Sequence, residues 1–303
     1  MKLREVAGFS RQLEVQFAFS RVVREAVPEE LKSAASKIVG VNQIIAVASG
    51  KGGVGKSTVA TNLAVALMQA GHKVGLLDAD IYGPSQGALF GLPSDTRPDV
   101  VDNQLVPVVG HGVHCMSMSF LASSKTPAIW RGPMASGALQ QMLSQTAWPG
   151  LDYLVIDMPP GTGDIQLTLA QQVPVSGAVI VTTPQDIALL DARKGIEMFR
   201  KVAVPVLGMV ENMSQFICPS CGEAADIFGS GGGERVAAEY AVPLLAQIPL
   251  TAETRARSDA GEPVALDSES AVGRVFANLA AATLGQLTQA KGPTAPIISI
   301  VDD

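Results

Sequence analysis

One ten-residue stretch combines two lysines and three hydroxyl side chains with four glycines: Ser49-Gly50-Lys51-Gly52-Gly53-Val54-Gly55-Lys56-Ser57-Thr58. It fits the pattern G-x-x-x-x-G-K-[ST], whose glycines let successive backbone N–H groups point at phosphate oxygens. Lys56 would meet the β- and γ-phosphates of a nucleotide, and the Ser57 hydroxyl would meet Mg²⁺. Since an apolar run precedes the stretch and a helical pattern follows it, Gly50 through Thr58 predict a nucleotide site and not a plain glycine turn.

Two later segments end an apolar run in acidic residues. In Leu76-Leu-Asp78-Ala-Asp80, either carboxylate could hold Mg²⁺ through water or polarise an attacking water, and the alternative for each is a helix or turn cap. Leu154-Val-Ile-Asp157-Met-Pro-Pro-Gly161 looks like a Walker B element. There Asp157 would act on Mg²⁺ through a bound water, and the Gly161 N–H could sense the γ-phosphate.

An amide side chain follows another predicted strand at Asn212. Because it can donate and accept hydrogen bonds at once, it suits the edge of adenine. A lone asparagine at the end of a strand is also a common turn residue, and the sequence favours neither interpretation.

Two cysteines, Cys218 and Cys221, form a C-x-x-C motif in a polar, glycine-rich loop. Structural zinc and iron–sulfur clusters each normally take four protein ligands, so this pair is half of a metal site that a symmetric dimer would complete. We favour a bridging metal or cluster over a redox pair, which needs the motif at the start of a helix, and over incidental thiols. The remaining cysteine, Cys115, falls in a predicted strand, and the nearby His111 and His114 are interpreted as structural because their side chains would largely point to opposite faces.

Strand and helix patterns alternate from Ile44 onward, which predicts an α/β fold with a mostly parallel sheet and helices on both faces, as in P-loop NTPases. The predicted strands are Ile44–Ser49, Lys73–Asp78, Val113–Met118, Tyr153–Asp157, Ala178–Thr182, Val206–Glu211 and Leu245–Ile248. The predicted helices are Lys56–Ala70, Met134–Gln145, Ile165–Gln172, Ile187–Lys201, Gly233–Tyr240 and Ser270–Leu287.

Three segments are expected along the chain. Residues 42–288 would form one ATPase domain that includes the cysteine loop. Residues 1–41 contain a predicted strand around Leu13–Phe19 and a helix from about Pro28 to Lys37. This extension either packs on the main domain or is the remnant of a small α/β module. Residues 289–303 are expected to be a flexible tail or a short added strand.

Composition narrows the classes of partner. The 303 residues carry a net charge of −6 with a pI near 5.2 and no basic run, so neither nucleic acid nor an anionic membrane is an expected partner. The sequence has no apolar stretch long enough to cross a membrane, and its first residues carry charge where a signal peptide needs an apolar core. With only three cysteines as well, we expect a cytoplasmic protein without a disulfide framework.

Taken together, these motifs resemble the Mrp/ApbC family of iron–sulfur cluster carrier ATPases, within the deviant Walker A group that includes the MinD/ParA proteins. The resemblance covers about Val41 to Leu287. It rests on Gly50–Thr58, Asp78-Ala-Asp-Ile-Tyr-Gly-Pro-Ser85, Trp130-Arg-Gly-Pro-Met134, Asp157-Met-Pro-Pro-Gly-Thr-Gly-Asp164, Glu211-Asn-Met213 and Cys218-Pro-Ser-Cys-Gly222.

The resemblance implies a homodimer with ATP between the subunits. Lys51 would reach the partner's nucleotide and neutralise developing charge, Asp80 would orient water, and a [4Fe–4S] cluster would bridge the subunits through Cys218 and Cys221. Hydrolysis would be slow and act as a switch, with a cluster donor and apo iron–sulfur proteins as partners. Many bacterial members begin with a complete small α/β domain, and residues 1–41 match only its latter part.

Two other functions remain open at this point. A positioning or partition switch of the MinD/ParA kind would need a membrane-binding amphipathic tail or a basic DNA-binding surface, and the acidic tail and low pI argue against both. A zinc-stabilised ATPase dimer without cluster transfer would use the same thiolates as a cluster carrier, so the sequence cannot separate these two.

Overall fold

The computed structural model of the chain describes residues 37–121 and 132–290. Three predicted features lie outside these ranges. They are the strand around Leu13–Phe19, the helix from about Pro28 to Lys37, of which only Lys37 is described, and the tail beyond residue 290. Trp130 and Arg131 of the sequence motifs lie outside them as well.

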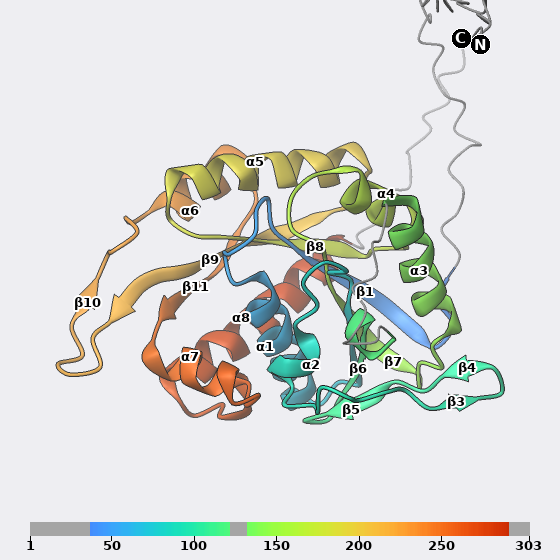
Figure 1. The fold of residues 1–303 in the computed structure, drawn as a ribbon. Helices are drawn as coiled ribbons and strands as arrows, with labels where there is room; N and C mark the ends of the chain where they lie inside the picture. The colour runs from blue at the N-terminus through green and yellow to red at the C-terminus, as the bar shows by residue number, and fades with distance from the viewer. Residues whose placement is uncertain (1–36, 122–131, 291–303) are drawn as a thin grey trace, which may run out of the picture. The chain divides into compact units, whose positions relative to one another are not determined.

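The described residues form one large sheet and a small hairpin (Figure 1). The strands are β1 Val41–Ala48, β2 Val74–Asp78, β3 Val100–Val101, β4 Gln104–Leu105, β5 Val108–Gly110, β6 Val113–Ser117, β7 Leu151–Asp157, β8 Gly177–Thr182, β9 Val206–Ile217, β10 Ala224–Ala225 and β11 Leu244–Leu250. The sheet runs in the order β10-β9-β8-β1-β7-β2-β6-β5, with β11 also paired to β9. All of its pairings are parallel except β5 with β6 and β10 with β9, whereas β3 and β4 form the separate hairpin.

Helices cover both faces of the sheet, as predicted (Figure 1). The helices are α1 Lys56–Gln69, α2 Gln86–Leu89, α3 Gly132–Gln145, α4 Asp164–Gln172, α5 Asp186–Lys201, α6 Gly232–Glu239, α7 Ala252–Asp259 and α8 Ala271–Ala290. Helices α1, α2, α7 and α8 lie on one face, and α3 to α6 lie on the other. Helix α1 is buried over most of its length because it packs between the sheet and α8.

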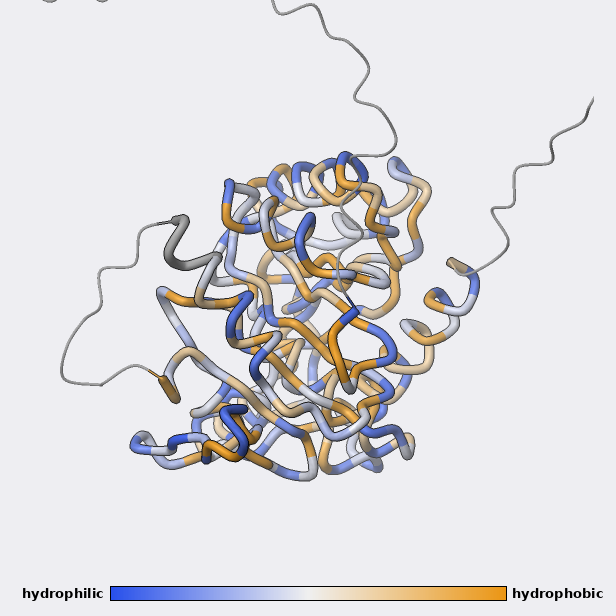
Figure 2. Tube along the Cα trace, turned by 90° about the vertical axis from the view of Figure 1, so that its right-hand side faces the viewer, coloured by the Kyte–Doolittle hydropathy of each residue, from blue (hydrophilic) through white to orange (hydrophobic). Residues whose placement is uncertain are grey.

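The core follows the central strands, whose residues are apolar without alternation because both faces are covered. Residues 44–48 of β1 and all of β2 and β8 are buried. Figure 2 shows hydrophobic segments, in orange, passing through the interior of the domain. A sheet packed this way holds the carboxyl ends of its parallel strands at one edge, where ligands bind in such folds.

The fold prediction is confirmed, because each predicted strand and helix that lies within the described residues is present. Most predicted boundaries differ from the observed ones by one to three residues, and the largest error is in the strand predicted to end at Glu211, which continues to Ile217. Residues 212–217 stay in the sheet because β11 and β10 both pair with them, so Asn212 lies inside β9 and is not a turn residue. Helix α7 and the short elements α2, β3, β4, β5 and β10 were not predicted.

Candidate functional site

The glycine-rich loop joins β1 to α1 at the edge where the carboxyl ends of the parallel strands lie. Gly53 and Gly55 both have positive φ, 82° and 79°, a backbone conformation that favours glycine. Gly55 is also the N-cap of α1 and supplies no side-chain cap. The first N–H groups of a 14-residue helix therefore face the loop without a capping side chain, as an anion site requires.

Lys56 and Asp157 form a buried ion pair below this loop. The second carboxylate oxygen of Asp157 accepts a hydrogen bond of 2.8 Å from the side-chain amide of Gln86. The same amide group also donates to the Ser57 carbonyl oxygen over 3.1 Å, and Thr61 donates to Gln86 over 2.6 Å. The motif lysine and the predicted Walker B aspartate thus contact each other directly, an ion pair that the sequence analysis did not predict.

Gln86 is a site residue that the sequence analysis missed. It is fully buried, and its side-chain amide connects α1 to the end of β7. Its position directly after the Asp78–Ser85 motif is the one signal that could have identified it.

Asp78 and Asp80 take different roles. Asp78 is fully buried, and its Oδ2 accepts hydrogen bonds from the N–H groups of Ser85 and Gln86 and from the Ser117 hydroxyl. Asp78 therefore caps α2, which is the alternative the sequence left open for it. Burial and the charge of Asp157 raise the pKa of Asp78 to about 7. Asp80 is half-buried and accepts a hydrogen bond from the Gly83 N–H.

The loop after β7 also contacts the glycine-rich loop. The Gly161 N–H donates a hydrogen bond of 2.9 Å to the Ser49 carbonyl oxygen. If it senses a γ-phosphate, as predicted, it must first leave this partner. The same bond provides a direct route by which phosphate at one loop would alter the other.

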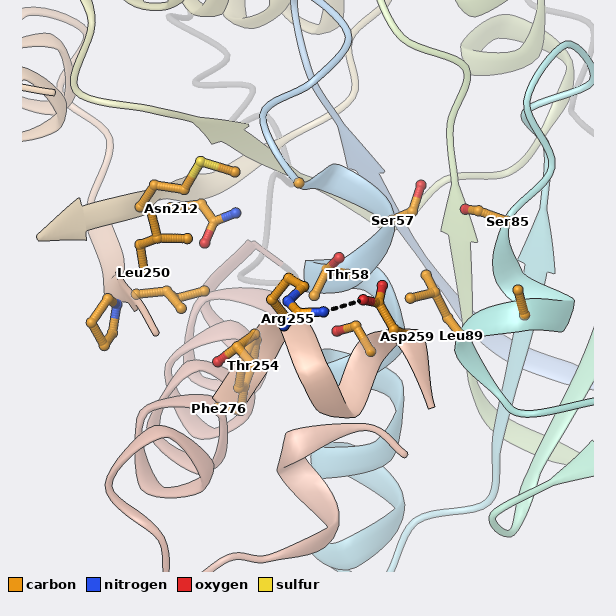
Figure 3. A pocket seen from close by; sticks show the side chains of 16 residues that line it. Ser57, Thr58, Ser85, Leu89, Asn212, Leu250, Thr254, Arg255, Asp259 and Phe276 are labelled. Carbon is orange, nitrogen blue, oxygen red and sulfur yellow. Dashed lines mark hydrogen bonds and ion pairs between the residues drawn. The ribbon is translucent and has the colours of Figure 1, made fainter. Parts of the chain in front are cut away.

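A cavity of about 550 Å³ opens beside the start of α1. Its wall combines Gly55, Ser57 and Thr58 with Asn212 of β9, so four of the predicted nucleotide contacts line one space. Figure 3 shows the side chains of Ser57, Thr58 and Asn212 around it. The side chains of α7 close the opposite wall, where Arg255 and Asp259 form an ion pair of 2.8 Å. Lys51 and Asp80 do not line this cavity.

Helix α7 was missed because it has no buried residue, and so no apolar periodicity marks it. Its start does carry a local signal, since the Thr251 side chain accepts a hydrogen bond of 3.0 Å from the Thr254 N–H as an N-cap.

The cysteine pair lies away from the cavity, in the turn between β9 and β10. Cys221 is exposed and Cys218 is half-buried. Hydrogen bonds from the backbone N–H of Cys221, the backbone N–H of Ser220 and the Cys221 thiol lower the pKa of Cys218, which favours the thiolate that binds metals. Cys115, in contrast, is buried within β6, and burial raises the pKa of its thiol.

The family model described as ParA, NUBPL iron-transfer P-loop NTPase, matches residues 40–284. The chain belongs to this family. An iron-sulfur cluster carrier protein of Pseudomonas fragi is 59% identical over 84% of this chain and 89% of its own length. One of Escherichia coli K12 is 55% identical over 82% of this chain, which spans only 68% of that relative.

Two solved structures agree with the fold. A nucleotide-binding protein from Archaeoglobus fulgidus, in complex with ADP, has a TM-score of 0.66 and 42% identity over 73% of this chain and 87% of its own. The cell-division ATPase MinD of Pyrococcus furiosus has a TM-score of 0.60 over 80% of this chain and 98% of its own, at 24% identity, and shows the fold alone. Both structures confirm the predicted fold, and the family model, the carrier proteins and the Archaeoglobus structure confirm the family resemblance and the ATPase assignment.

In this member of the iron-transfer NTPase family a single strand connects the two candidate regions. Strand β9 carries Asn212 at the cavity beside α1 and leads, six residues later, to Cys218. In the described part of the chain, no helix is long and apolar enough to cross a membrane.

Proposed function

We propose that this protein is an ATP-dependent carrier that binds an iron–sulfur cluster between two subunits and transfers it to apo-proteins. The observation that carries the proposal is the accessible cysteine pair at the end of the strand that also lines the nucleotide cavity. The names of the relatives, iron-sulfur cluster carrier proteins of several bacteria, support the same conclusion. A cytoplasmic location agrees with this role.

The thiolates account for the need for two subunits. Cys218 and Cys221 supply two of the four ligands that a [4Fe–4S] cluster normally takes from protein, and Cys115 is buried in the sheet. A second copy of the chain would contribute an equivalent pair across a two-fold axis, because symmetric dimers bring the same surface of each subunit together. The cluster is therefore proposed as cargo shared by a homodimer.

The nucleotide site supplies the switch. We assign the phosphates to Gly50–Thr58 and Mg²⁺ to the Ser57 hydroxyl, with Asp157 acting through a metal-bound water. The site offers hydroxyl and carboxylate oxygens, the hard donors that Mg²⁺ prefers, and the metal would neutralise phosphate charge. Asp80 would orient the attacking water, and Lys51 of the partner subunit would stabilise the charge that develops.

The position of Lys51 supports its assignment to the nucleotide of the partner subunit. The preceding Gly50 is close to α5, where an added Cβ would lie 2.1 Å from the backbone oxygen of Asp191. The loop is thereby anchored next to α5, and Lys51 does not line its own subunit's cavity. Because Lys51 lies outside the cavity of its own subunit, it is available to contact the nucleotide bound by the partner subunit.

Anaerobic reconstitution with iron and sulfide tests the proposal. The wild-type protein should develop cluster absorbance near ~400 nm with about four irons per dimer, in agreement with one [4Fe–4S] cluster. A Cys218→Ala/Cys221→Ala variant should lose it, and Cys115→Ala should keep it as the matched control. Absorbance that survives the double substitution, or zinc without sulfide in protein purified without oxygen, would contradict cluster carriage.

A further inference from the structure

The hydroxyl group of Ser85 is buried and, within residues 37–121 and 132–290, has no hydrogen-bond partner. Ser85 is the N-cap of α2, a position where a serine side chain ordinarily accepts a hydrogen bond from a backbone N–H of the first turn. Here it makes no such bond. An unpartnered buried hydroxyl is destabilising, so a ligand that forms a hydrogen bond with this group would remove that cost.

Asp78 explains why the Ser85 hydroxyl does not cap α2. Its Oδ2 accepts the hydrogen bonds from the N–H groups of Ser85 (2.9 Å) and Gln86 (3.0 Å), so a carboxylate from β2 caps α2 in place of the serine side chain. The backbone of Ser85 is thereby fixed while its side chain keeps its hydrogen-bonding capacity.

Ser85 lines the cavity beside α1 together with Ser57, the residue assigned to Mg²⁺. In Figure 3 the two side chains lie beside one another, Ser57 on α1 and Ser85 at the start of α2, and the Ser85 hydroxyl points toward Ser57. The two segments are also tied together, because the amide of Gln86 donates to the carbonyl oxygen of Ser57 over 3.1 Å. The distance between the two serines is therefore set by a direct contact.

We propose that Ser85 is a positioning residue for the metal–nucleotide complex, whose hydroxyl hydrogen-bonds a water in the hydration shell of Mg²⁺. The inference rests on the proposed function, because it takes ATP with Mg²⁺ as the ligand. Mg²⁺ keeps several of its waters in protein sites, so a hydroxyl opposite the metal-binding Ser57 meets a water and not the ion itself. The base end of the cavity, lined by Asn212 and Leu250, lies on the other side of α1 in Figure 3.

ATP binding measured by titration calorimetry, with Mg²⁺ and separately with EDTA, tests this role. For Ser85→Ala we expect an affinity within about twofold of wild type in EDTA and about fivefold weaker in Mg²⁺, which is the range of one hydrogen bond. Ser85→Thr keeps the hydroxyl and should restore Mg²⁺-dependent binding. The matched control is Ser144→Ala, at an exposed position on α3, which should bind like wild type in both conditions.

Thermal unfolding of the nucleotide-free variants separates this role from a structural one. Ser85→Ala should not lower the unfolding temperature, because it removes a hydroxyl that has no partner. Equal loss of affinity with and without Mg²⁺, no loss in either, or a lowered unfolding temperature would each overturn the inference. A wild-type protein that fails to bind ATP would instead contradict the proposed function, and cluster loading is measured independently.

Discussion

The side-chain amide of Asn212 donates a hydrogen bond of 2.8 Å to the backbone carbonyl oxygen of Val54. This bond joins β9 to the glycine-rich loop beside the cavity that Asn212 lines. Because a carbonyl oxygen can only accept, it also fixes the orientation of the amide, with Nδ2 toward Val54 and Oδ1 left as an acceptor.

If Asn212 contacts the base, as predicted, that orientation determines which base is preferred. An acceptor suits the exocyclic amino group of adenine and opposes the O6 carbonyl of guanine, so we expect ATP to bind about tenfold or more tightly than GTP. Asn212→Ala should weaken ATP binding and bring the two affinities close together. Purine riboside triphosphate, which lacks the amino group, should bind the wild type and the variant alike. A variant that retains the full preference for ATP would show that another group selects the base.

The buried ion pair between Lys56 and Asp157 links the free energy of unfolding to ATP binding. Asp157→Ala leaves the Lys56 ammonium group buried without its counter-ion, a change that costs about 3–5 kcal/mol in the free energy of unfolding. Phosphates can replace the lost carboxylate, so ATP in EDTA should stabilise the variant more than the wild type.

Urea unfolding with and without ATP measures both effects. The control is Asp152→Ala on the same strand, whose carboxylate only accepts a hydrogen bond from the exposed Lys73 N–H and should cost about 1 kcal/mol or less. Equal stabilisation of the Asp157 variant and the wild type by ATP would mean that Lys56 does not exchange the carboxylate for phosphate.

The sequence was most informative where one local pattern decides the outcome. Runs of apolar residues predicted the buried parallel strands, and the glycine spacing predicted the loop and the start of α1 at Lys56. Polar residues whose roles depend on distant neighbours were harder to place. Gln86 belongs to the candidate site only because α1 and β7 place Ser57 and Asp157 around it, and no local sequence pattern predicts that contact.

Asp78 is a second polar residue whose role depends on another part of the chain. Its position at the end of β2 was predicted, but its choice between metal and helix cap is set by α2, eight residues further along. Helix α7 could not be found from periodicity, since it lies over the cavity with polar residues and buries none of them.

Two neighbouring glycines in the loop should respond differently to alanine. A Cβ at Gly50 would lie 2.1 Å from the Asp191 backbone oxygen, so Gly50→Ala must displace the loop from α5 and should cost about 1–3 kcal/mol. At Gly52 the nearest atom would be 3.9 Å away and φ is not positive, so Gly52→Ala should change stability by about 0.5 kcal/mol or less. Urea unfolding of the nucleotide-free proteins compares the two. Equal effects would show that the approach of the loop to α5 is not maintained in solution.

The thiol of Cys218 should titrate below the ordinary range of cysteine in the metal-free protein. The backbone N–H groups of Cys221 and Ser220, followed by the Cys221 thiol, donate hydrogen bonds that stabilise its thiolate, and this lowers its pKa. The rate of iodoacetamide alkylation, followed for the Cys218 peptide by mass spectrometry from pH 5 to 10, should therefore rise at a lower pH than in a short peptide of the same sequence. Unfolding in urea should return the midpoint to that of the peptide, because the N–H groups no longer converge on the sulfur. Identical midpoints in the folded and unfolded states would show that the turn between β9 and β10 does not hold the thiolate ready for iron.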